Sequence, residues 1–273
     1  MFKSRLTSGI ILVILAFGTV IAGGEILAAV LCLISLIAYG ELCKVCEIHK
    51  KQKGKNYLEI IGYISIVLYY TTMILWKNPM HMAWVVSMSF IFHLFIYVFT
   101  FPRYHITQIM GSFFSFIYGP VMFSFLFLTR QLEYGVYFVW MIFISSWISD
   151  TCAYCVGVLI GKHKLAPILS PKKSIEGSVG GILGSVIVGA LFGYFIVERV
   201  ITQQQVTWIF ALIGGVGSVV SQIGDLAASA IKRNYEIKDY GKLIPGHGGI
   251  MDRFDSIIVT APMIYFLFSL LVS

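Results

Sequence analysis

The sequence predicts an all-α, polytopic integral membrane protein with about nine transmembrane helices. Of its 273 residues, 58% are hydrophobic and only 12% are charged, about half of the roughly 25% typical of soluble domains. Apolar runs recur along the whole chain, and each approaches the ~20 residues that a membrane-spanning helix needs. A soluble enzyme, a disordered chain and a disulfide scaffold are excluded, because a water-soluble surface needs more charge than this sequence holds.

The first two predicted spans are short, and only Gly23-Gly24-Glu25 separates them. Lys3 and Arg5 before the first apolar run also resemble the start of a signal peptide. Because Val20-Ile21-Ala22 is a poor small-x-small cleavage site, we expect a retained helix. The expected spans are 7–23, 25–42, 57–76, 82–101, 108–128, 136–160, 177–198, 208–231 and 254–272.

The basic residues test this count independently. When the loops are numbered alternately, one side of the membrane holds 17 of the 20 Lys and Arg residues, and the other holds only Lys77, Arg130 and Arg199. Since such an excess marks the cytoplasm, we expect a cytoplasmic N-terminus, an outside C-terminus and insertion in the cell (inner) membrane. Cytoplasmic loops and anionic lipid headgroups then account for the net charge of +7, and we expect no nucleic-acid partner.

Residues 1–273 are expected to form a single membrane domain whose two halves differ. All five aspartates lie in the second half, at Asp150, Asp225, Asp239, Asp252 and Asp255. We therefore expect residues 1–135 to form scaffold helices, with lipid or dimer contacts left open. Residues 136–273 are expected to carry the catalytic helices and cytoplasmic loops.

The sixth span and the loop after it combine a carboxylate with an anion-binding pattern. Ser146, Asp150, Ala153 and Gly157 share one helical face. A carboxylate inside a span must face protein, water or an ion, although a structural Asp that caps a broken helix would explain it equally well. The loop brings Ser170-Pro171-Lys172-Lys173-Ser174 to the start of a glycine-rich helix. Hydroxyls, ammonium groups and exposed amides there favour phosphate binding, whereas the lysines alone would also mark cytoplasmic topology.

The eighth span carries Asp225 on a face that is otherwise small and hydroxylated. Small residues alone would indicate close helix packing. An unpaired carboxylate in lipid would be protonated or displaced, so we expect a cation, a lysine or a polar cavity opposite Asp225. The other members of this face are Gly214, Gly217, Ser218, Ser221, Gly224 and Ala228.

The loop over residues 232–253 gathers basic residues and glycines. It contains five Lys or Arg residues, a Pro-Gly-His-Gly-Gly turn and an Asp-Arg-x-Asp helix start. Glycines let backbone amides approach phosphate oxygens, and the basic side chains neutralise a polyphosphate. Asp252 and Asp255 share one helical face and are able to hold Mg²⁺. N-capping of the last helix would explain these two aspartates, but not the whole assembly.

The segment from Ser229 to Asp255 resembles the signature of the CDP-diacylglycerol synthases, the phosphatidate cytidylyltransferases. That signature reads Ser-x-apolar-Lys-Arg, four residues, Lys-Asp-x-small, two residues, apolar-Pro-x-His-Gly-Gly-apolar-x-Asp-Arg-apolar-Asp, and every fixed position is filled. Asp150–Tyr154, Ser170–Gly177 and Gln222–Leu226 are also similar to the family. The resemblance covers residues 140–256 strongly, whereas the first five spans match only as generic membrane helices.

The resemblance implies that the chain transfers the cytidylyl group of CTP to phosphatidate, giving CDP-diacylglycerol and pyrophosphate for phospholipid biosynthesis. It implies Mg²⁺ as the cofactor and leaves open a second, monovalent cation such as K⁺, and a homodimer. The expected metal ligands are Asp225, Asp252 and Asp255, and the expected catalytic residues are Asp225, Asp252, Lys232 and Arg233. The expected substrate-binding residues are Lys172, Lys173, Ser174, Lys238, Lys242, His247, Gly248, Gly249 and Arg253.

Such a reaction brings two like-charged reactants together, so catalysis must rest mostly on charge neutralisation and positioning. We expect in-line attack by the lipid phosphate, without a covalent intermediate, at a site facing the cytoplasm. Two alternatives remain. A cation-coupled transporter would use Asp150 and Asp225 as its ion site, but leaves the one-sided basic loop unexplained. A cytidylyltransferase for another lipid phosphate, such as the archaeal ether lipid, differs only in substrate.

Overall fold

A computed structural model describes residues 2–48, 55–201, 206–244 and 248–272. Within these ranges, eight helical segments are long and apolar enough to cross a membrane. The chain is therefore an all-α, multi-pass membrane protein, as predicted, and these segments match the predicted spans to within a few residues. The remaining predicted span, 7–23, falls in a helix whose described apolar part is Val13–Ala22. The sidedness of the two termini stays a prediction.

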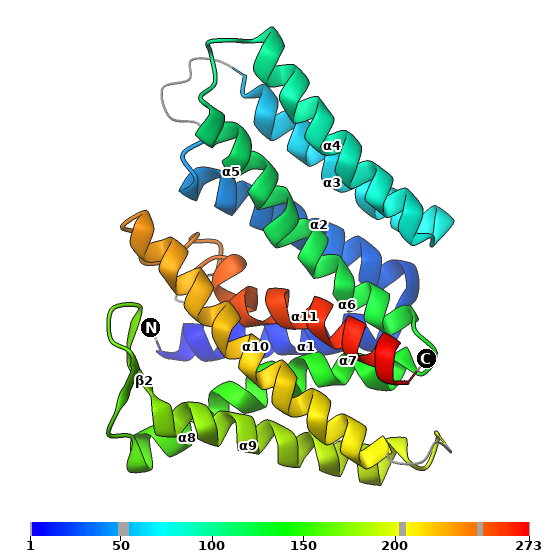
Figure 1. The fold of residues 1–273 in the computed structure, drawn as a ribbon, viewed down its shortest axis with the longest axis vertical. Helices are drawn as coiled ribbons and strands as arrows, with labels where there is room; N and C mark the ends of the chain where they lie inside the picture. Colours follow the sequence, from blue (N-terminus) through cyan, green and yellow to red (C-terminus); the bar gives the residue numbers. More distant parts are fainter. Residues whose placement is uncertain (1, 49–54, 202–205, 245–247, 273) are drawn as a thin grey trace. The chain divides into compact units, whose positions relative to one another are not determined.

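Helices follow one another along the whole chain (Figure 1). Three spans each contain one π-helical segment, a local widening of the helix that often occurs near functional sites. These are η1 (Ile117–Val121), η2 (Ile144–Ile148) and η3 (Gly193–Val197). The α-helices are α1 (Phe2–Ala22), α2 (Gly24–Val45), α3 (Tyr57–Trp76), α4 (Pro79–Phe99), α5 (Ile106–Phe116), α6 (Met122–Gln131), α7 (Gly135–Phe143), α8 (Ser149–Ile160), α9 (Ile175–Phe192), α10 (Val206–Asn234) and α11 (Met251–Leu271).

The chain divides into two compact units. The first comprises Met1–Phe127 and Ile237–Arg253, and the second comprises Leu128–Glu236 and Phe254–Ser273. The expected division into a scaffold half and a catalytic half stays a prediction. In the first unit, buried hydroxyls hold neighbouring helices together: Tyr39 Oη lies 2.8 Å from Ser112 Oγ, and Tyr70 Oη lies 2.8 Å from Ser35 Oγ. Such pairs satisfy polar groups that neither lipid nor an apolar core can satisfy.

In the second unit, α8, α9 and α10 lie side by side (Figure 1). Glycines permit this close approach, because a Cβ at Gly181 would lie only 2.8 Å from the carbonyl oxygen of Ser149. A Cβ at Gly214 would likewise overlap the backbone of α9. The small residues of the eighth span thus pack against neighbouring helices, as membrane helix interfaces require. Away from them, Phe138 of α7 stacks on Phe268 of α11, with ring centroids 3.9 Å apart.

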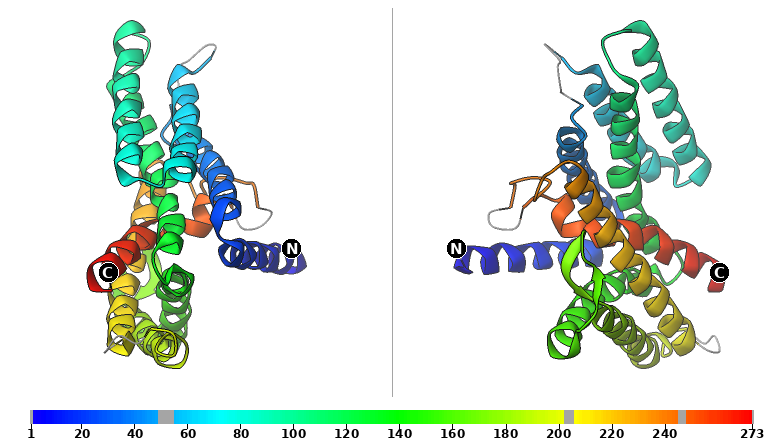
Figure 2. Two further views of the ribbon diagram at one scale, coloured as in Figure 1. Left: turned by 90° about the vertical axis from the view of Figure 1, so that its right-hand side faces the viewer. Right: turned by 60° about the vertical axis from the view of Figure 1, so that its left-hand side comes forward.

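A short antiparallel hairpin follows α8 and leads into α9 (yellow-green in Figure 2). Its strands are β1 (Lys164–Ala166) and β2 (Ser170–Ser174), and Lys164 is paired with Ser174. The sequence predicted only a loop between the sixth and seventh spans, so this hairpin is an addition to the all-α fold. It matters for function because β2 carries the lysines of the predicted anion site.

Candidate active site

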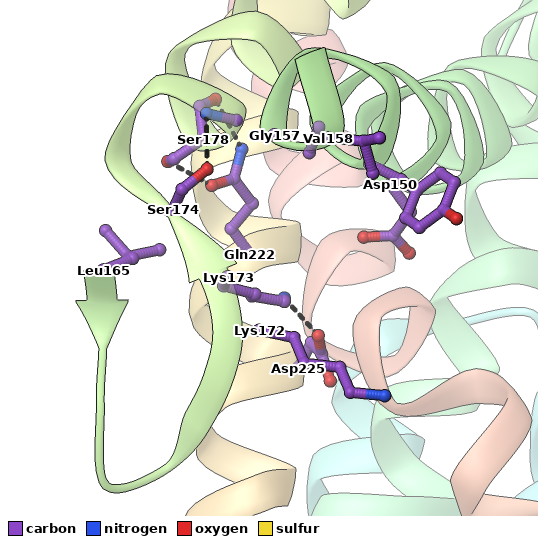
Figure 3. A pocket seen from close by; sticks show the side chains of 13 residues that line it. Asp150, Gly157, Val158, Leu165, Lys172, Lys173, Ser174, Ser178, Gln222 and Asp225 are labelled. Atoms are coloured by element: carbon purple, nitrogen blue, oxygen red, sulfur yellow. Dashed lines mark hydrogen bonds and ion pairs between the residues drawn. The ribbon is translucent and has the colours of Figure 1, made fainter. Parts of the chain in front are cut away.

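A cavity of about 460 Å³ lies in the second unit, between α8, the hairpin, α9 and α10 (Figure 3). One part of its wall is apolar and is formed by residues that include Val158 and Leu165. The other part is charged and carries Asp150, Lys173 and Asp225. A ligand held here meets an apolar surface and both signs of charge. The remaining lining residues are Ala153, Tyr154, Gly157, Lys172, Ser174, Gly177, Ser178 and Gln222.

The Nζ atom of Lys173 forms an ion pair with Oδ2 of Asp225 (Figure 3). The two side chains come from β2 and α10 and are 27% and 25% exposed. This contact confirms the expectation that a lysine or another cation lies opposite Asp225. Because both side chains also line the cavity, the pair offers an ammonium group and a carboxylate to the same ligand.

Hydrogen bonds fix the helices that carry the cavity wall. Ser178 Oγ of α9 donates to the side-chain oxygen of Gln222. The amide nitrogen of Gln222 donates to the carbonyl oxygen of Ser178 at 3.1 Å and to Ser149 Oγ at 3.3 Å. Ser174 Oγ accepts the backbone N–H of Gly177 at 3.2 Å and so caps α9. A satisfied network of this kind orders the side chains around it. Asp225 is one of its neighbours, because it lies three residues beyond Gln222 on α10.

A third carboxylate lies beside this pair. Gly224 brings α11 so close to α10 that a Cβ at this position would lie 3.2 Å from the backbone oxygen of Asp255. Asp255 interacts electrostatically with Asp225, Asp150 and Lys232. The second unit thus gathers three carboxylates and the ammonium groups of Lys173 and Lys232. Carboxylates that act on one another in this way repel unless a cation or a proton lies among them, and Lys173 provides one such cation.

The basic loop of the first unit is built around a turn at Gly248, whose φ is +88°. The N–H of Ile244 donates to the carbonyl oxygen of Gly248 at 2.9 Å. Oδ2 of Asp252 accepts the N–H of Gly249 at 2.9 Å and that of Tyr240 at 2.8 Å. Asp252 therefore organises the loop through backbone amides. The alternative from the sequence, N-capping, likewise gives this aspartate a structural role as an acceptor of backbone N–H groups. Lys238, Lys242 and Arg253 are exposed around this turn.

The predicted site residues fall into two groups. The first group meets at the cavity of the second unit and consists of Lys172, Lys173, Ser174 and Asp225. The second unit, outside the cavity lining, also contains Lys232, Arg233 and Asp255. Lys238, Lys242, Gly248, Gly249, Asp252 and Arg253 belong to the first unit. The shared metal site of Asp225 and Asp252 stays a prediction, and His247 lies outside the described residues.

Two polar residues of the cavity wall, Ser178 and Gln222, were not predicted as site residues, although Gln222 belongs to a stretch that resembles the family. Both carried a signal in their spacing. Gln222 precedes Asp225 by three residues and so shares a helical face with it, and Ser178 lies one turn beyond Ser174, the cap of α9. A third missed residue, Glu41 of α2, contacts the loop of the first unit. Nothing in its local sequence distinguishes it from a carboxylate near the end of a span.

The carboxylates fit Mg²⁺ by their chemistry. The described residues contain no group of three or more His, Cys, Asp or Glu side chains that would hold a metal by themselves. Mg²⁺ does not require such a group, because it usually binds through one or two carboxylates, water and substrate phosphates. Asp225 and Asp255 would offer carboxylate oxygens from two adjacent helices.

The fold and this cavity define a multi-pass membrane protein with a site that is partly apolar and partly charged. The chain belongs to the Cytidylyltransferase family, whose sequence model matches residues 3–271. It is 33% identical to a phosphatidate cytidylyltransferase of Staphylococcus saprophyticus over 267 residues, which cover 96% of this chain and 97% of that protein. Proteins of the same name from Staphylococcus epidermidis and Staphylococcus aureus are 33% and 32% identical over the same coverage.

Proposed function

We propose that this protein transfers the cytidylyl group of CTP to phosphatidate, giving CDP-diacylglycerol and pyrophosphate. The observation that carries the proposal is the cavity in which Lys173 and Asp225 lie beside an apolar wall. A lipid phosphate needs both environments, since its headgroup is anionic and its tails are not. Family membership and the names of the relatives support the same reaction.

In this reaction an oxygen of the lipid phosphate attacks the α-phosphorus of CTP in line, and pyrophosphate leaves. Both reactants are anions, so the protein must neutralise charge and hold the two groups in place. Lys172 and Lys173 line the cavity and would hold a phosphate there. Lys232, Arg233, Lys238, Lys242 and Arg253 would hold the triphosphate. No nucleophilic side chain of the protein takes part, so no covalent intermediate forms.

Asp225 and Asp255, with Asp252, would hold Mg²⁺, and a second, monovalent cation such as K⁺ fits the same acidic group. Bound Mg²⁺ supplies charge stabilisation for the phosphate groups. The active site would lie on the cytoplasmic side of the cell (inner) membrane. CTP is present on that side, and 17 of the 20 basic residues are expected there. The phosphatidate tails would reach the cavity from the bilayer. A homodimer is compatible with this arrangement.

Pyrophosphate release from purified protein tests the proposal. The panel consists of CTP, dCTP and ATP, each with phosphatidate or with an archaeal ether lipid phosphate. We expect release only with a cytidine nucleotide and phosphatidate together, and none with Asp225→Asn protein. Preference for the ether lipid would support the other cytidylyltransferase. Absence of release with every pair, in protein that remains monodisperse, would contradict the proposal and favour ion transport.

A further inference from the structure

Glu41 is a buried carboxylate in the part of the chain for which the sequence indicated no chemistry. It lies near the end of α2 and is only 6% exposed. Oε1 accepts the N–H of Ile250 at 3.1 Å, and Oε2 accepts the N–H of Met251 at 3.0 Å. Burial of a carboxylate is costly unless hydrogen bonds replace its hydration, and these two amides provide them.

The two amides lie at the start of α11, which begins at Met251. The first amides of a helix have no partner within the helix, and the helix dipole favours a negative charge at this end. Glu41 therefore caps α11 from another helix, 210 positions away from Met251 in the chain. Side chains of the loop itself normally make such a cap.

The loop also folds closely around this carboxylate. A Cβ at Gly241 or Gly249 would overlap the carboxylate oxygens of Glu41, so a side chain at either position would displace this carboxylate. Glu41 and Asp252 together bind four backbone amides of the loop, those of Tyr240, Gly249, Ile250 and Met251. All of these contacts lie within the first unit.

We propose that Glu41 is a positioning residue for CTP binding. It acts by holding the loop that carries Lys238, Lys242 and Asp252 in one shape, and it does not touch the substrate itself. This inference rests on the proposed function, because the loop is the proposed triphosphate site. Helix α2 then contributes to the geometry of the CTP site through this carboxylate.

The test compares Glu41→Gln, Glu41→Asp and Glu25→Gln. Glutamine keeps the shape but presents an NH₂ group to one of the two amide donors, so that hydrogen bond is lost. Aspartate keeps the charge with a shorter side chain. Glu25 lies on the same helix and is exposed, which makes its substitution a matched control for loss of charge on α2.

We expect Glu41→Gln to raise KM for CTP about tenfold or more, the usual effect of losing a residue that orients binding groups. KM for phosphatidate should stay unchanged, Glu41→Asp should recover part of the loss, and Glu25→Gln should behave as the wild type. Hydrogen exchange should become faster at the amides of Ile250 and Met251.

A Glu41→Gln protein with unchanged KM for CTP and unchanged exchange at these amides would overturn the inference. Equal changes in both KM values would indicate a general structural role and would also overturn it. If Glu41→Gln does not fold, the same measurements apply to Glu41→Asp. Absence of CTP turnover in the wild-type protein would contradict the proposed function instead. In that case, unchanged hydrogen exchange of the loop amides on adding CTP would also exclude binding of CTP to the loop.

Discussion

The ion pair between Lys173 and Asp225 provides the sharpest test of the active site. Lys173→Met keeps the length of the side chain and removes its charge, and Asp225→Asn keeps the shape of the carboxylate and removes its charge. Each substitution abolishes the same ion pair. Only Asp225→Asn removes a proposed Mg²⁺ ligand, so the two variants should agree in stability and differ in turnover.

The exposure of the pair sets the size of the effect on stability. A hydrogen bond to a charged partner contributes about 1.5–3 kcal/mol. Because 27% and 25% of the two side chains are exposed, solvent screening brings the contribution to the lower end, about 1.5 kcal/mol. Each variant should lose roughly this amount, and the double variant less than the sum, because only one contact is lost. Such a loss leaves a typical protein folded.

The assay combines thermal unfolding with pyrophosphate release, in one detergent and with and without Mg²⁺. Asp225→Asn should abolish turnover and lose the stabilisation by Mg²⁺, which requires metal bound to the native state. Lys173→Met should keep that stabilisation and lose about tenfold in kcat/KM through a weaker phosphate contact. Lys164→Met, an exposed lysine of the same hairpin, should change neither quantity. Near-normal turnover of Asp225→Asn at ordinary Mg²⁺ would refute the assignment of Asp225.

Three further predictions concern topology, substrate binding and packing. A cysteine at position 238 should be labelled from the cytoplasm and one at position 199 from outside, and labelling of both from the same side would contradict the nine-span topology. Arg233→Ala should lower kcat/KM for CTP about tenfold, whereas Arg199→Ala should not; equal losses would indicate general surface charge. Gly214→Ala should lower the free energy of unfolding by roughly 1–3 kcal/mol, because its Cβ overlaps α9. Gly18→Ala should not, because no atom lies within 4 Å of its Cβ. Similar melting temperatures of the two variants would contradict the close packing of α10 on α9.

The sequence predicted the spans closely because length and apolar composition determine them directly. The predicted span 57–76 coincides with α3, Tyr57–Trp76, and the others differ by a few residues at their ends. The hairpin of β1 and β2 was missed for a physical reason. Its strands have three and five residues, too short for a period of two to be recognised, and Pro167 and Pro171 in this segment favour a loop.

The site was predictable in kind but not in its pairing. The need for a cation opposite Asp225 follows from the cost of a carboxylate among apolar helices. The sequence does not reveal which cation it is, because this depends on how β2 packs against α10. Lys173 and Asp225 are 52 residues apart in the chain. The contact of Glu41 with the start of α11 was even less accessible, since more than 200 residues separate the partners.

The small residues of the second unit have a role beyond packing, since they determine where the charged groups lie. Ser149 Oγ is 2.7 Å from Ser218 Oγ, and Gln222 donates to Ser149 as well. Gly181 of α9 leaves room for Ser149, because a Cβ there would lie 3.0 Å from Ser149 Oγ. The bonds of Ser149 hold α10 at Ser218 and Gln222, less than one turn before Asp225, whose carboxylate pairs with Lys173. A larger residue at Gly181 would overlap Ser149 and disturb this network, so we expect Gly181→Ala to lower kcat/KM as well as thermal stability.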